Sequence, residues 1–168
     1  KFPCLIECTS NQVNQNGGHT NKTQKMFIKE ILNISKKINF DSKKLFLGGD
    51  HLGPLPWKKE NTKSAIKNSI LLINQFLKYN FCKIHIDTSI KCKDDKYINS
   101  EIIFNRTNKI LNDFNIKRKI KNKFLVIGTE VPLSGSGDNN KIVKTSKKQI
   151  VSEVTKFKEI LKKLNLKS

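Results

Sequence analysis

The chain has 168 residues, 36% of them hydrophobic, and a formal net charge of +19. This length suits one domain with a buried core, and no apolar run approaches the roughly 18 residues that cross a membrane. Only Arg106 and Arg118 are arginines, whereas proteins that read nucleic acid favour arginine for its bidentate hydrogen bonds. A general compositional bias toward lysine therefore explains the high positive charge more simply than nucleic-acid binding does. A basic nucleic-acid-binding protein remains the alternative.

The sequence has four cysteines without a CxxC pair or zinc-finger spacing: Cys4, Cys8, Cys82 and Cys92. Cys4 and Cys82 fall in apolar runs, where a reduced cysteine packs as a small core residue. We therefore expect a reducing compartment, the cytoplasm. The N-terminus has neither a signal-peptide pattern nor an initiator methionine, so we expect residues 1–168 to be a single incomplete domain from a longer chain.

Taken in order, the chain alternates apolar runs with helix-like segments. The runs, which predict buried strands, cover residues 4–7, 45–50, 82–87 and 124–131. Hydrophobic residues at helical spacing follow each run and predict four helices. The first begins after Thr23, the second extends from about Asn61 to Tyr79, the third carries hydrophobic residues from Ile103 to Phe114, and the fourth begins after Thr145 or Ser146.

Strands that alternate with helices are typical of parallel βαβ units. Four such units make either half of a (β/α)8 TIM barrel or a small open sheet with helices on both faces. No GxGxxG pattern follows a strand and the sequence has no P-loop, so a dinucleotide-binding sheet is unsupported. The sequence therefore predicts an α/β fold, a partial (β/α)8 TIM barrel of about four consecutive βα units.

Each predicted strand carries a carboxylate at or near its end, although parallel strands buried on both faces are otherwise almost purely apolar. These acids are Glu7, Asp50, Asp87 and Glu130, separated by 43, 37 and 43 residues. Ligands bind at this end of barrel strands, so we predict that the four acids surround a site for acid–base chemistry or a divalent metal. The alternative is that they pair with lysines and backbone amides and stabilise the loops.

Histidines accompany two of these acids. His51 follows Asp50 directly, and His85 should share the inward face of its strand with Asp87. We predict His51 as a metal ligand, while His85 fits either a site residue or a core histidine. A catalytic zinc needs about three protein ligands. His19 is a weaker candidate for a further nitrogen ligand.

Loop residues add candidates for substrate binding. Asn11 and Gln12 belong to an amide cluster that could line a pocket for hydroxyl groups or satisfy the loop backbone. Ser134 opens a Ser-Gly-Ser-Gly run whose amides could bind phosphate, although flexible loops share this composition. Gly48 and Gly128 lie two residues before an acid and leave room for a ligand or a bulky neighbour.

Four motifs together resemble one known family. They are residues 5–15 with Gly17-Gly18, the block 48–54, residues 83–89 and residues 127–132. In this order and spacing they are similar to the D-tagatose-1,6-bisphosphate aldolase non-catalytic subunit family, whose members act in galactitol and N-acetylgalactosamine catabolism. The resemblance covers nearly the whole chain.

The resemblance implies a (β/α)8 barrel related to class II aldolases. In those enzymes an Asp-His pair at a strand end supplies the catalytic acid and one zinc ligand, and Asp50-His51 matches this pair. Glu130 is a looser match to an acidic position on a later strand. Further zinc-binding histidines of the catalytic relatives lie in strands that this chain lacks, so the resemblance implies at most an incomplete Zn²⁺ site. Cys8 and His19 stand where the family usually has an alanine and an aromatic residue.

The leading hypothesis is a non-catalytic subunit that supports the activity and stability of a catalytic class II aldolase partner. A metal-dependent lyase acting on a phosphorylated ketose is the alternative, with Asp50 as acid and His51 on zinc. The predicted catalytic or auxiliary acids are Glu7, Asp50, Asp87 and Glu130. The predicted metal ligand is His51. The predicted substrate-binding residues are Asn11, Gln12, His85 and Ser134.

Overall fold

The structure is a computed structural model that describes residues 2–128 and 146–166. Strands and helices alternate along the chain. The strands are β1 (Cys4–Thr9), β2 (Leu45–Leu52), β3 (Lys83–Asp87) and β4 (Phe124–Gly128). The helices are α1 (Gln24–Lys37), α2 (Thr62–Lys78), α3 (Ser100–Leu111), α4 (Phe114–Lys119) and α5 (Lys147–Lys163). Short 3-10 turns precede β2 (η1, Ser42–Lys44), follow it (η2, Leu55–Trp57) and precede β4 (η3, Ile120–Asn122).

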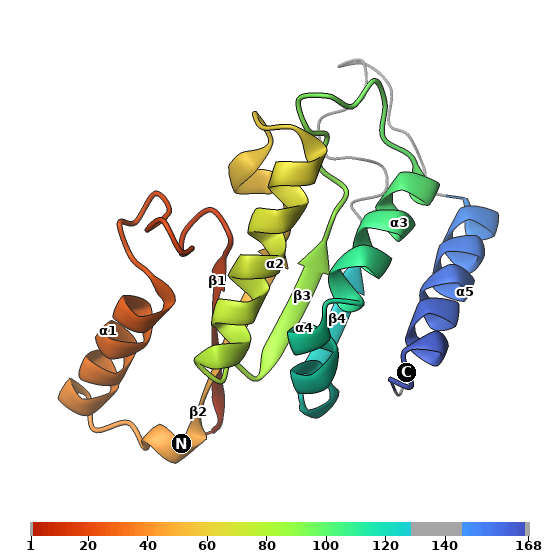
Figure 1. The fold of residues 1–168 in the computed structure, drawn as a ribbon. Helices are drawn as coiled ribbons and strands as arrows, with labels where there is room; N and C mark the ends of the chain where they lie inside the picture. Colours follow the sequence, from red (N-terminus) through yellow and green to blue (C-terminus); the bar gives the residue numbers. More distant parts are fainter. Residues whose placement is uncertain (1, 129–145, 167–168) are drawn as a thin grey trace.

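The four strands form one parallel sheet in the order β1-β2-β3-β4. Figure 1 shows the helices as one layer over one face of this sheet. Sequential strand order with helices on a single face is the arrangement of a barrel, whereas a doubly wound sheet reverses its order and carries helices on both faces. The predicted partial (β/α)8 barrel of four βα units is confirmed.

The main core lies between the sheet and the helices. Asn61 caps α2, because its side chain accepts a hydrogen bond from the Ser64 amide at 2.9 Å. The buried stripe of α2 includes Ile73 and Phe76, and both are fully buried. Ile84 and Ile86 of β3 are also fully buried in this core, as their alternation with His85 predicts.

The prediction of one helix from Ile103 to Phe114 is wrong in one respect, because α3 ends at Leu111 and a separate helix, α4, begins at Phe114. The Asp113 carboxylate accepts hydrogen bonds from the amides of Asn115 and Ile116, which starts a new helix after Leu111. Phe114 therefore does not join the apolar stripe and is 75% exposed. Ile116, on the new helix, is buried in its place.

The cysteines also differ from the prediction. Cys4 and Cys82 are only half-buried, and Cys82 precedes β3 rather than lying in it. Cys8 and Cys92 are the buried pair, and all four thiols are free. Burial, with a smaller contribution from the charge of Glu7, raises the pKa of Cys8 to about 12, which leaves this thiol unreactive.

The face of the sheet opposite the helices is open. Side-chain alternation places Leu5, Phe46, Phe124 and Val126 on this inner face, and all four are exposed, Phe124 by 76%. A closed barrel buries such residues in its interior, and four strands leave them uncovered. Within the described ranges, no helix is both long and apolar enough to cross a membrane.

Phe76 provides a test of this core. Its replacement in Phe76→Ala leaves a cavity beneath α2 and should lower the free energy of unfolding by about 3–5 kcal/mol. The control Phe114→Ala removes an exposed ring of the same size and should cost at most about 1 kcal/mol. Urea denaturation followed by circular dichroism measures both, and equal losses would contradict the core described here.

Candidate functional site

The candidate site lies on the inner face near the carboxyl ends of β1, β2 and β3. Strand pairing sets Glu7 beside Gly48, and Gly48 beside Lys83. Because Gly48 has no side chain, Glu7 and Lys83 meet across β2, directly below Asp50. The sheet register therefore brings together side chains that are up to 76 residues apart in the sequence.

Asp50 is hydrogen-bonded to two imidazoles at once. Its Oδ2 lies 2.7 Å from His51 Nδ1 and its Oδ1 lies 2.8 Å from His85 Nδ1. The centres of the two rings are 4.7 Å apart. An ionised carboxylate only accepts hydrogen bonds, so both Nδ1 atoms donate to Asp50.

The charge of Asp50 follows from these contacts. Burial by itself raises the pKa of Asp50, but the hydrogen bonds from His85 and His51 outweigh that effect. The net result is a pKa below the ordinary value for aspartate. Asp50 is therefore an anion at neutral pH.

A bulge in β2 allows adjacent residues to reach the same site. In a regular strand Asp50 and His51 would point to opposite faces. The register between β2 and β3 shifts between Gly49 and Leu52, and His51 adopts a left-handed φ of 48°. Bulges of this kind redirect side chains and are frequent beside active sites. The Ser10 hydroxyl donates a hydrogen bond to the His51 carbonyl at 2.8 Å and holds the bulge in place.

Glu7 is paired with a lysine. Lys83 Nζ lies 2.7 Å from Glu7 Oε1 and 3.6 Å from Asp50 Oδ1. Burial lowers the pKa of Lys83, but the hydrogen bond and charge of Glu7 raise it overall, so Lys83 is a cation. The contact of Glu7 with Lys83 therefore matches the alternative prediction, in which a strand-end acid pairs with a lysine.

The two glycines on the inner face make room for bulky neighbours. A Cβ at Gly48 would lie 2.5 Å from Glu7 Oε1, and a Cβ at Gly128 would lie 3.0 Å from His85 Nε2. Glu7 and His85 therefore occupy the space that these glycines leave open.

Among the described residues, Asp87, Asn11 and Gln12 do not join Asp50 and the two histidines. Asp87 is buried and accepts hydrogen bonds from the amide and hydroxyl of Ser89, at 2.8 and 2.6 Å. Gln12 Oε1 accepts from the Thr9 amide at 2.9 Å, and the Asn11 carbonyl accepts from the His19 amide. These contacts hold the loops that follow the strands. Glu130 and Ser134 lie outside the described residues.

Two contributors, Ser10 and Lys83, were not predicted. Lys83 could have been found, because it lies two residues before His85 and so shares its inward face. Ser10 acts through the main chain of His51, and that contact depends on a bulge with no pattern in the sequence.

Asp50, His51 and His85 form a possible metal-binding cluster. Each can offer one ligand atom, and these atoms lie within 4.8 Å of one another on partly buried side chains. Two imidazole nitrogens and a carboxylate oxygen form the donor set of many catalytic zinc sites, which leave a fourth position open. The donor set therefore fits a divalent transition metal.

Comparison with known proteins identifies the family. The family described as "D-tagatose-1,6-bisphosphate aldolase subunit GatZ/KbaZ-like" matches residues 1–168. The chain belongs to this family. The resemblance carried by the four sequence motifs is confirmed, and Asp50, His51 and His85 all lie within two of those motifs.

Individual relatives agree with this assignment. A curated "D-tagatose-1,6-bisphosphate aldolase subunit GatZ" of Escherichia coli O1:K1 is 39% identical over 135 residues, which is 78% of this chain and 32% of the relative. The subunit of the same name from Escherichia coli O139:H28 is 44% identical over 91 residues, 54% of this chain and 22% of the relative. The chain thus spans about a third or less of the length of these relatives.

A solved structure supports the fold. The crystal structure of a probable tagatose 6 phosphate kinase from Sinorhizobium meliloti 1021 superposes with a TM-score of 0.81 at 29% sequence identity. The match covers 98% of this chain and 39% of that protein.

The state of Asp50 predicts a pH dependence. Because its pKa is lower in the folded chain than in the unfolded one, its ionisation stabilises the fold above the ordinary carboxyl pKa of about 4. This stabilisation is lost as the pH falls through the lowered pKa. The difference in unfolding free energy between wild type and Asp50→Asn should therefore shrink from neutral to acidic pH. Urea titrations at several pH values measure it, and a constant difference would contradict the hydrogen bonding described.

Proposed function

We propose that this chain is a barrel segment of a non-catalytic subunit of tagatose-1,6-bisphosphate aldolase. In this function it supports the activity and stability of a catalytic class II aldolase subunit during galactitol and N-acetylgalactosamine catabolism in the cytoplasm. The family match over residues 1–168 carries the proposal. We also propose that these residues form one incomplete barrel domain, because a single hydrophobic cluster extends from Cys8 on β1 to Leu164 after α5.

We propose further that Asp50, His51 and His85 hold Zn²⁺ in this subunit. The support is the donor set and the proximity of the ligand atoms. If the chain acted on substrate, a metal held here would polarise a carbonyl oxygen of a phosphorylated ketose. In this structure Asp50 is hydrogen-bonded to both imidazoles through their Nδ1 atoms, and Lys83 balances the negative charges of Glu7 and Asp50.

The same cluster supports a second candidate, a metal-dependent lyase that cleaves a phosphorylated ketose without a partner. Here Asp50 would serve as the acid and His51 as a zinc ligand. Cleavage by the purified chain alone, lost in Asp50→Asn, would favour this candidate over the non-catalytic subunit. Absence of cleavage together with stabilisation of a catalytic subunit would favour the leading proposal.

Support of a partner is directly measurable. Mixing this chain with the catalytic tagatose-bisphosphate aldolase subunit from the same genome should lengthen the half-life of aldolase activity at elevated temperature several-fold, because binding to the native state opposes unfolding. An unrelated basic protein at the same concentration is the control for charge. An unchanged half-life would contradict the proposed function.

Metal binding has its own test. Equilibrium dialysis with Zn²⁺ should show about one ion bound per chain, and His51→Gln or His85→Gln should weaken binding at least about tenfold, because each removes one of three ligands. His19→Gln is the matched control, since His19 lies outside the cluster and should leave the affinity unchanged. Equal affinities in all variants would contradict the site.

A further inference from the structure

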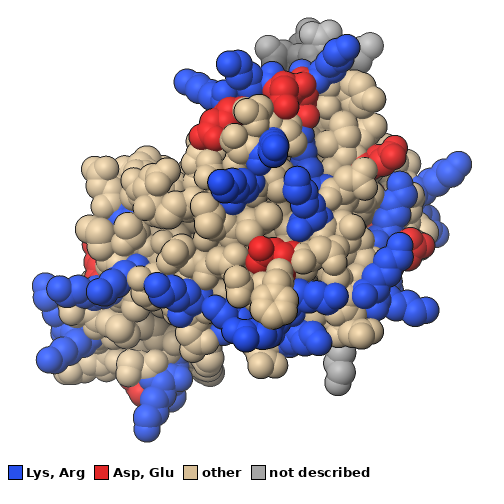
Figure 2. Space-filling view, viewed as in Figure 1, with Lys and Arg blue, Asp and Glu red and all other residues tan. Residues whose placement is uncertain are grey.

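A dense group of basic side chains lies at the opposite end of the sheet from Asp50, His51 and His85. Because the strands are parallel, the helix ends and turns that lead into them meet at this amino-terminal end. Figure 2 shows lysines and arginines along this lower side of the molecule. We call the group the basic rim, and its twelve members are Lys36, Lys37, Lys43, Lys44, Lys78, Lys117, Arg118, Lys119, Lys121, Lys123, Lys162 and Lys163.

Helix dipoles alone do not account for the basic rim. Lysines near a helix C-terminus offset about half a negative charge per helix, and α1, α2, α4 and α5 end at rim residues, so about −2 charges are available. The acids close to these lysines are Asp41 and Asp113, which accept backbone hydrogen bonds as caps, and Glu159, which lies one turn before Lys163 on α5. The rim therefore keeps a large excess of positive charge over the described residues that surround it.

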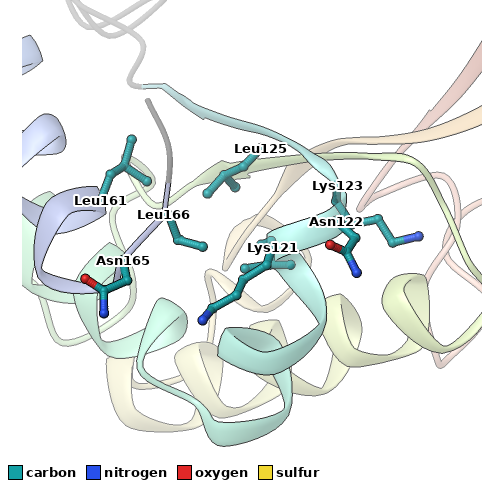
Figure 3. A pocket seen from close by; sticks show the side chains of 8 residues that line it. Lys121, Asn122, Lys123, Leu125, Leu161, Asn165 and Leu166 are labelled. Carbon is teal, nitrogen blue, oxygen red and sulfur yellow. The ribbon is translucent and has the colours of Figure 1, made fainter.

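The rim also contains a cavity whose lining combines leucine side chains with lysine and asparagine. A space of about 530 Å³ lies between η3, the start of β4 and the end of α5. Figure 3 shows Leu125, Leu161 and Leu166 around this space, with Lys121 beside them. A buried apolar anchor surrounded by charged contacts is typical of protein interfaces, in which a few side chains carry most of the binding energy.

The composition of the rim favours a protein over a nucleic acid. Eleven of its twelve members are lysines, and lysine is a hydrated point charge that lacks the planar fork with which arginine binds phosphates and bases. Lysines at an interface chiefly speed the encounter with a partner of opposite charge.

We propose that the basic rim is a docking surface for an acidic face of a protein partner, which inserts one apolar side chain into the cavity beside Leu125. The inference rests on the proposed function, and the partner is then the catalytic aldolase subunit. Docking at this end leaves the cluster of Asp50, His51 and His85 uncovered.

Charge reversal with a matched control tests the docking surface. The rim variant Lys43→Glu/Lys44→Glu/Lys121→Glu changes exposed lysines in the turns η1 and η3. The control Lys58→Glu/Lys59→Glu/Lys93→Glu changes exposed lysines in the loops after β2 and β3, at the other end, and alters the net charge equally. Association with the catalytic subunit from the same genome is followed by stopped-flow fluorescence at several salt concentrations.

The rim variant should associate at least about tenfold more slowly than wild type and with a weaker salt dependence, whereas the control should stay within about twofold. Equal losses in both variants, or no loss in the rim variant, would overturn the docking surface while the proposed function stands. Absence of any complex with wild-type protein would overturn both. Thermal melts confirm that each variant is folded.

A second measurement separates the kinds of polyanion. A poly-glutamate peptide should slow association of wild type with the catalytic subunit more than a single-stranded oligonucleotide of equal charge. If only the oligonucleotide binds, and the rim variant loses that binding while associating normally with the catalytic subunit, the surface belongs to nucleic acid and the proposal fails.

Discussion

The Asp50 carboxylate, held between His51 and His85, is the interaction on which the arrangement of the inner face depends. A partly buried anion is costly unless it is paired and hydrogen-bonded, and here both oxygens are engaged while Lys83 lies 3.6 Å from one of them. Without that anion, two imidazoles and an ammonium group would face one another across the strands. Asp50 therefore sets both the protonated nitrogens of the histidines and the local balance of charge.

The backbone beneath this cluster is constrained from both sides. A Cβ at Gly49 would lie 2.6 Å from the ring of Phe76, and a Cβ at Gly53 would collide with the carbonyl of Asp87. The block from Gly48 to Gly53 thus packs against the core of α2 on one side while it presents Asp50 and His51 on the other. The bulge needs this support, because a left-handed histidine persists only where surrounding contacts hold it. The geometry of the site and the packing of the core are coupled through this one segment.

The two ends of the sheet differ in chemistry. At the carboxyl ends, acids and histidines contact one another closely, while at the amino ends an excess of lysines surrounds a cavity with a mixed polar and apolar lining. A barrel separates these ends by the length of its strands, so the proposed metal site at one end and the proposed docking surface at the other need not compete.

The sequence by itself determined the alternation of strands and helices, the inward direction of His85 and the family, because periodicity and local motifs act over a few residues. It also placed an acid near every strand end. Only the tertiary structure decided which acids share a site: the register pairs Glu7 with Lys83, Asp87 turns to Ser89, and the bulge brings His51 beside His85. It likewise decided that Asp113 starts a new helix and leaves Phe114 exposed. These outcomes depend on contacts between residues far apart in the chain, or on competition between a cap and a continuing helix, and a one-dimensional pattern records neither.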